Sequence, residues 1–175
     1  MMTRQRYNLI GILAAAVLIA LDQWTKYLAV LHLKGQSPIV LWEGVFEFHY
    51  LENRGAAFGI LQGQKGVFLA CTVLILFLIA FFYTRMPAKK RYSLLRAVGV
   101  LLAAGAVGNL IDRMSHSYVV DFLYFKLIDF PVFNVADCYV TVGAVLLAVL
   151  ILFVYKEEEL GFLSLKKREG KKEDA

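Results

Sequence analysis

Long runs without a single charged residue constrain the fold of this chain more than any other feature. Gly66 to Thr84 is 19 residues without a charge, and Cys138 to Tyr155 is 18. As α-helices rising about 1.5 Å per residue, these runs reach roughly 27–28 Å, about the thickness of a bilayer core. This pattern argues against a soluble globular fold and predicts membrane-spanning helices.

Two further apolar runs extend the pattern. Tyr7 to Leu21 continues to Leu33 if the polar residues of that stretch are accepted, and Ala97 to Ile111 extends back to Tyr92 if Arg96 snorkels to the membrane interface. The composition agrees, with 59% hydrophobic and 19% charged residues. We therefore expect an all-α integral membrane protein with four transmembrane helices. The predicted spans are residues 7–33, 66–84, 92–111 and 135–155, in a single domain of residues 1–155.

The distribution of basic residues predicts the orientation in the membrane. The alternative for the first run is a cleavable secretory signal, because Arg4 and Arg6 precede it, but its apolar character resumes after Trp24. With four spans, thirteen Lys and Arg lie on the side of the termini and five on the other side. By the positive-inside rule both termini are cytoplasmic. The net charge of +5 then reflects topology and contact with anionic membrane lipid, and nucleic-acid binding is not expected.

Residues 156–175 are predicted to form a basic, solvated cytoplasmic tail. The first outer connection, from Lys34 to Lys65, is rich in strand formers. Ile39 to Leu51 alternates at period two, which predicts a small sheet at the membrane surface, with its aromatic residues facing lipid headgroups. The sequence from Asn53 to Gly59 follows, and its glycines permit tight turns and close backbone approach. A plain hairpin turn is the alternative there.

The second outer connection, residues 112–134, is unusual because it carries acids next to apolar residues. Acids at membrane depth are costly and are functional candidates by default. Asp121 in this connection and Asp137 just beyond it are such acids, flanked by Val119-Val120 and by Val135-Ala136. The alternatives are structural: Asn134 and Asp137 as cap and first-turn acid of the last helix, and Asp121 as an interfacial acid in a short surface helix. Asp129 is predicted to be a turn residue.

Polar residues on two of the predicted helices share one face each. Asn109 lies three residues before Asp112 and four before Arg113, so all three project together. The alternative is an interfacial ion pair between Asp112 and Arg113. Asp22 and Lys26 are also four residues apart, in the order that favours ion pairing.

Several catalytic and metal-binding chemistries lack their sequence signatures. The three histidines form no zinc-binding pair, and no Gly-x-Ser-x-Gly motif occurs. Cys71 and Cys138 have no disulfide or metal spacing and are predicted to be buried thiols. The remaining chemistry is that of two carboxylates that share a proton, one acting as general base on water and the other as general acid. An Asp137 at a helix N-terminus would be the base.

Five motifs in order resemble the bacterial lipoprotein signal peptidase family, signal peptidase II. They are Asp22 to Lys26, Asn53 to Gly59, Gly108 to Arg113, Val119 to Phe122, and Phe133 to Asp137. The resemblance covers residues 8–155 and implies an aspartic endopeptidase of the bacterial cytoplasmic membrane. Its substrate would be a prolipoprotein carrying a diacylglyceryl group on a cysteine, cut immediately before that cysteine, without metal or other cofactor.

The resemblance also assigns roles to individual residues. Asp121 and Asp137 would be the catalytic dyad, at the extracytoplasmic leaflet. The substrate-binding or supporting residues would be Asn53, Gly55, Asn109, Arg113, Asn134, Asp22, Lys26 and Asp112. The strand-rich segment would be a β-rich cradle and the second connection a short surface helix or lid, and we expect a monomer.

Two other function classes stay open from the residues alone. A proton-coupled carrier would use Asp22, Asp121 and Asp137 as a relay, although no inverted repeat is found. A non-enzymatic membrane scaffold would use the same acids only in interfacial ion pairs.

Overall fold

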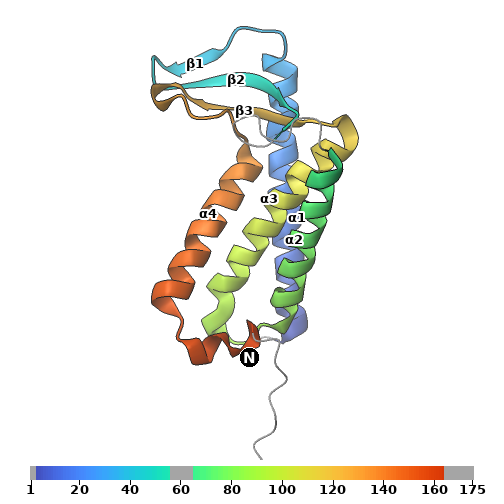
Figure 1. Ribbon diagram of the computed structural model, residues 1–175, viewed down its shortest axis with the longest axis vertical. Helices are drawn as coiled ribbons and strands as arrows, with labels where there is room; N and C mark the ends of the chain where they lie inside the picture. The colour runs from blue at the N-terminus through green and yellow to red at the C-terminus, as the bar shows by residue number, and fades with distance from the viewer. Residues whose placement is uncertain (1–2, 56–64, 164–175) are drawn as a thin grey trace, which may run out of the picture.

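Four long helices with a small sheet across one end make up the computed structural model, which describes residues 3–55 and 65–163 (Figure 1). The helices are α1 (Arg4–Leu33), α2 (Lys65–Arg85), α3 (Ser93–His116) and α4 (Val135–Val149), the last continued by the π-helical η4 (Leu150–Val154). Each is long and apolar enough to cross a membrane, which confirms the predicted four-helix membrane fold. The predicted features at residues 56–59 and 164–175 lie outside the described residues.

Helix α3 is the centre of the bundle, and α1, α2 and α4 all pack on it. It buries Leu95, Val98 and Ala104. The outer helices instead expose large apolar side chains, such as Val17 on α1 and Phe77 on α2. A helix that is apolar on its outward face suits lipid rather than water.

Two side chains of the bundle differ from the sequence-based expectation. Cys71 is exposed on α2, so the prediction of a buried thiol is wrong there, because α2 is a peripheral helix that faces outward; Cys138 is half-buried, and both cysteines are free. Arg96 does not snorkel outward. It is 3% exposed, and its Nη2 donates a hydrogen bond to the carbonyl of Met86 at 2.8 Å.

The sheet has three antiparallel strands in the order β1 (Ile39–Trp42), β2 (Phe46–Asn53) and β3 (Val119–Phe125). The predicted cradle is therefore present, and the second outer connection adds β3 to it. Two of the aromatic residues predicted to face headgroups, Phe48 and Tyr50, are half-buried and pack on the buried cluster of Ala29, Leu33 and Phe122. This cluster fixes the sheet on the end of α1.

The second outer connection is a strand where Asp121 lies, not a surface helix. Its β-branched and aromatic residues favour extended backbone. Between β3 and α4 the helical element is the short 3-10 turn η3 (Lys126–Ile128). Asp129 follows in a left-handed conformation, with φ of 48°, and accepts a hydrogen bond from the Tyr124 hydroxyl at 2.5 Å, so it is the predicted turn residue.

The end of the bundle opposite the sheet holds the N-terminus and the 3-10 helix η5 (Glu157–Leu163), as Figure 1 shows. Phe162 packs edge-on against Tyr92, with ring centroids 5.7 Å apart. Arg91 Nε donates to Glu159 Oε1 at 2.9 Å. Residues 157–163 are therefore packed on the bundle rather than forming the predicted solvated end.

Candidate active site

Asp121 lies on β3 and is 1% exposed. Asn53 is the last residue of the neighbouring strand β2. In the sheet Leu51 is opposite Asp121, which places the end of β2 beside the carboxylate. Asn53 Nδ2 donates to Asp121 Oδ2 at 2.8 Å, and Asn134 Nδ2 donates to Asp121 Oδ1 at 2.6 Å. Both carboxylate oxygens of Asp121 are thus oriented by side-chain amides from separate elements.

Asp137 lies in the first turn of α4, and Asn134 caps that helix. Asn134 Oδ1 accepts from the Asp137 backbone N at 3.0 Å, and Asp137 Oδ2 accepts from the Asn134 backbone N at 3.2 Å. The predicted capping arrangement is therefore present as a reciprocal capping box. Asp137 Oδ1 accepts in addition from Asn109 Nδ2 at 2.7 Å. The two residues that cap α4 are therefore also residues of the candidate active site.

A cleft of about 610 Å³ opens onto both acids. It is lined by Asp121 and Asp137 and by apolar residues of η3, the following loop and the outer face of α4, including Ile128, Phe130 and Val142. The cleft falls in the size range of about 300–1,000 Å³ that is typical of ligand sites. Its lining is mostly apolar, and the two carboxylates are its charged groups.

Beneath the two acids lies a buried cluster built around Lys26. Lys26 Nζ is 3.0 Å from Asp22 Oδ2, 3.0 Å from Asp112 Oδ2 and 2.9 Å from Asn109 Oδ1. Because an ammonium group only donates, it turns the oxygen of the Asn109 amide toward itself. The NH₂ group of Asn109 is then left to face Asp137. This cluster therefore orients a direct partner of one candidate acid.

The two acids of the Lys26 cluster also hold the backbone next to Asp121 and Asp137. Asp22 Oδ1 accepts from the Ala136 backbone N at 2.9 Å. Asp112 Oδ2 accepts from the Val120 backbone N at 3.1 Å. Ala136 directly precedes Asp137, and Val120 directly precedes Asp121, so each supporting acid fixes the chain one residue before a candidate catalytic acid.

Gln23 belongs to the same cluster, although the sequence reasoning did not select it. Its Nε2 contacts Asp22 Oδ2 at 3.2 Å, Asp112 Oδ1 at 3.0 Å and the Gly108 carbonyl at 3.2 Å. The signal that pointed to it was its position between Asp22 and Lys26, as a further polar residue inside a span. Gly108 lets the cluster approach α3, because a Cβ at this position would lie 2.5 Å from Asp22 Oδ2.

Arg113 is placed near the site but touches neither candidate acid in its hydrogen bonds. Its Nη2 donates to the Gly55 carbonyl at 3.4 Å, and the Gly55 backbone N donates to Asn53 Oδ1 at 3.0 Å. Asp112 pairs with Lys26, so the alternative of an Asp112–Arg113 ion pair is not what the structure has. Arg113 thus acts on the segment that carries Asn53, a direct partner of Asp121.

The electrostatic environment of Asp121 favours its protonated form. Burial, and to a smaller extent the negative charge of Asp137, raise the pKa of Asp121 to about 7 against the opposing effect of the hydrogen bonds from Asn53 and Asn134. Near neutral pH the Asp121 carboxyl therefore holds a proton for a substantial part of the time. The described residues contain no group of three or more His, Cys, Asp or Glu side chains placed to hold a metal ion.

Comparisons with known proteins agree on one family. A sequence profile described as Signal peptidase (SPase) II matches residues 14–153. The chain is 43% identical over 145 residues to the lipoprotein signal peptidase of Streptococcus thermophilus (strain CNRZ 1066), covering 83% of this chain and 92% of that protein. It is 45% identical over 143 residues to the lipoprotein signal peptidase of Brevibacillus brevis, covering 82% of this chain and 93% of that protein.

Two solved structures of bacterial membrane enzymes, determined by the in meso method, have the same fold. One gives a TM-score of 0.74 at 30% sequence identity, covering 90% of this chain and 93% of the other. The second gives 0.72 at 32% identity, covering 83% and 94%.

Proposed function

The chain belongs to the signal peptidase II family, and from this we propose that it is an aspartic endopeptidase whose catalytic pair is Asp121 and Asp137. As a member of this family it is a multi-pass bacterial membrane protease that removes signal peptides from prolipoproteins. One observation carries the assignment of the pair. Asp121 and Asp137 come from separate elements, are both bonded to Asn134, and both line the same apolar cleft.

The two carboxyl groups differ in a way that separates their roles. Asp121 is buried, with a pKa of about 7, and carries the proton that acts as the general acid. Asp137 lies in the first turn of α4, where backbone N–H groups and the helix dipole favour its carboxylate form, and it acts as the general base. Environments that push two acids apart in this way are typical of acid–base pairs.

The proposed reaction is direct hydrolysis by an activated water. Asp137 accepts a proton from a water molecule as the water oxygen bonds to the scissile carbonyl carbon. Asp121 gives its proton to the amide nitrogen, the carbon–nitrogen bond breaks, and an amine and a carboxylic acid result. The proton on Asp137 then passes to Asp121, which restores the starting state of the pair.

The surroundings of the pair suit a lipid-modified peptide. Cleavage immediately before a diacylglyceryl-modified cysteine needs an apolar surface beside the acids, and Ile128, Phe130 and Val142 supply it in the cleft. Asn53 also lines the cleft, so the second N–H of its amide can bond to a peptide main chain whose side chains vary, while Gly55 supports Asn53 from behind. We propose that no cofactor takes part and that the monomer is sufficient.

The orientation in the membrane follows from the charge distribution. With the basic residues concentrated at the end that holds the N-terminus and η5, both termini are cytoplasmic. The sheet and the acid pair lie at the other end of the bundle, at the extracytoplasmic leaflet. A substrate anchored there by its acyl chains reaches the cleft without leaving the membrane.

The test uses the purified full chain in detergent with a diacylglyceryl-modified prolipoprotein peptide. We expect cleavage before the lipidated cysteine that persists in EDTA and is lost in Asp121→Asn and in Asp137→Asn. Asp129→Asn is the matched control, because Asp129 is an exposed acid of the same outer connection. Cleavage that survives either dyad substitution, or that EDTA removes, would contradict the proposal.

A further inference from the structure

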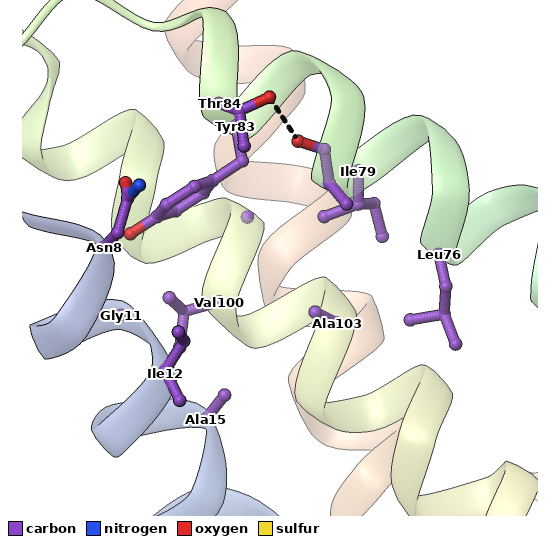
Figure 2. Close-up of a pocket in the computed structure, with 12 residues that line it drawn as sticks. Asn8, Gly11, Ile12, Ala15, Leu76, Ile79, Tyr83, Thr84, Val100 and Ala103 are labelled. Carbon is purple, nitrogen blue, oxygen red and sulfur yellow. Dashed lines mark hydrogen bonds between the residues drawn. The ribbon is translucent and has the colours of Figure 1, made fainter. Parts of the chain in front are cut away.

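A second cavity lies far from the acid pair, between α1 and α2 at the end of the bundle that holds the N-terminus. Its volume is about 430 Å³, and small residues of α3 form its floor. Figure 2 shows Ile12 and Ala15 of α1 facing Leu76 and Ile79 of α2 across this groove, with Ala103 of α3 between them. The groove exists because α1 and α2 both pack on α3 rather than closely on each other.

One end of the groove is polar. Figure 2 shows the Asn8 amide beside the ring of Tyr83, whose hydroxyl donates to the Tyr7 carbonyl at 3.2 Å. Gly11 makes room for this tyrosine, because a Cβ there would collide with the Tyr83 hydroxyl. Asn8 Oδ1 is buried and has no hydrogen-bond partner among the described residues. An acceptor left without a donor at the mouth of an apolar groove indicates a ligand that brings one.

The same end carries unbalanced positive charge. Arg96 stacks over the rings of Tyr7 and Tyr83, at 5.1 and 4.9 Å from their centroids. Its Nε and Nη1 are buried without a hydrogen-bond partner among the residues that the structure describes. The Arg96 guanidinium is enclosed by the two tyrosine rings, so it adds positive charge behind this end without lining the groove. Arg4 and Arg6 are exposed within the turn before Asn8, and Arg4 lies on the same face of α1 as Asn8.

We propose that this groove binds one anionic phospholipid. One acyl chain lies between α1 and α2, and the headgroup lies at the Asn8 end, where its phosphate accepts from the exposed Arg4 and Arg6 and a headgroup hydroxyl donates to Asn8. The occupant follows from location and charge: the groove is within the membrane-spanning helices, where aliphatic chains are the surrounding solvent, and its polar end is positive. From Asn8 to Ala15 the groove follows α1 for about 10 Å, enough for much of an acyl chain.

This site is independent of the peptidase assignment. It involves no residue of the acid pair or of the Lys26 cluster, and it belongs to the opposite leaflet. Loss of the lipid and loss of cleavage are therefore separately measurable.

The first test measures lipid retention by native mass spectrometry of the full chain, using phosphatidylglycerol and phosphatidylcholine with identical acyl chains. We expect the protein to retain one phosphatidylglycerol and little phosphatidylcholine. Ala15→Leu fills the groove, whereas Ala14→Leu adds the same side chain on an exposed position of α1. Each methylene displaced is worth roughly a fourfold change in affinity, so displacing two predicts about a fifteenfold loss for Ala15→Leu.

The second test addresses the headgroup. Asn8→Leu and Arg4→Gln should each reduce retention of phosphatidylglycerol, and Lys90→Gln, which removes an exposed charge at the same end, should not. Cleavage activity serves as the check that each variant is folded. If Asn8→Leu does not fold, Arg4→Gln tests the headgroup, and the comparison of Ala15→Leu with Ala14→Leu tests the acyl chain. Equal retention of the two lipids, or equal retention by Ala15→Leu and Ala14→Leu, would overturn the proposal.

Discussion

Asn134 donates its side-chain amide to Asp121 Oδ1 at 2.6 Å while its side-chain oxygen caps α4 at the backbone N of Asp137. One fully buried residue therefore sets the position of both candidate catalytic acids. An amide is suited to this task because its two ends are different, one donating and the other accepting. A carboxylate, which only accepts hydrogen bonds, could not satisfy both partners.

Substitution of Asn134 separates the cap from the active site. Asn134→Ser keeps a good helix cap but is too short to reach Asp121, whereas Asn134→Ala loses both contacts. We expect both variants to lose most cleavage activity, and Asn134→Ala to be less stable than Asn134→Ser by about 1 kcal/mol. Chemical unfolding and the peptide cleavage assay measure the two effects. Full activity in Asn134→Ser would show that the contact with Asp121 is dispensable.

The raised pKa of Asp121 predicts how activity depends on pH. If Asp121 must be protonated to act, kcat/KM falls as pH rises through about 7, the pKa of the buried carboxyl. A pH profile of kcat/KM on the lipidated peptide tests this. A rate that stays constant well above this pH would mean that Asp121 is not the acid.

The same pKa predicts how stability depends on pH. In the unfolded chain Asp121 ionises near 3.8, but in the folded protein it keeps its proton until about 7. Between these values the folded state holds more protons, so the free energy of unfolding falls with rising pH by about 1.4 kcal/mol per pH unit. Asp121→Asn should remove this slope. Unfolding curves of the unsubstituted protein and of Asp121→Asn, measured at several pH values in this window, test the prediction. Equal dependence of the free energy of unfolding on pH in the two proteins would contradict it.

Removal of Lys26 should destabilise the fold strongly. Lys26→Met leaves the buried carboxylates of Asp22 and Asp112 facing each other without a counter-charge, which costs about 3–5 kcal/mol. Lys34→Met is the control, because Lys34 is half-exposed in its ion pair with Glu52 and its loss should have a far smaller effect. Adding Asp112→Asn to Lys26→Met should recover part of the stability. No recovery in the double variant would argue against electrostatic coupling of these groups.

The close approach of α3 and α4 depends on Gly105. A Cβ there would lie 2.5 Å from the backbone oxygen of Ala136, which cannot move away as a flexible side chain can. Gly105→Ala should therefore destabilise the protein by about 1–3 kcal/mol and displace the start of α4. A Cβ at Gly66 on α2 meets nothing within 4 Å among the residues that the structure describes, so Gly66→Ala should change stability little. Thermal unfolding compares the two, and equal effects would mean that the helices separate freely.

The sequence was sufficient for the parts of this protein that depend on local chemistry. Uncharged runs long enough to cross a bilayer predict four helices, because lipid forces every backbone group in a span to bond within its own helix. The order Asn134-x-x-Asp137 predicts a cap, since both partners lie in one helical turn. Alternation in residues 39–51 predicts strands for the same kind of local reason.

The remaining features depend on contacts between distant segments, and only the tertiary structure decided them. Asp121 lies on a strand rather than a helix because the edge of β2 was available to pair with it. Gln23 is polar and lies inside a predicted span, but its partner Asp112, at 3.0 Å, is 89 positions away in the sequence. The burial of Arg96 beneath Tyr83 likewise required α2 and α3 to be packed together. Hydropathy and capping act within a few residues, but the environment of a buried charge is set by whichever groups the fold brings to it.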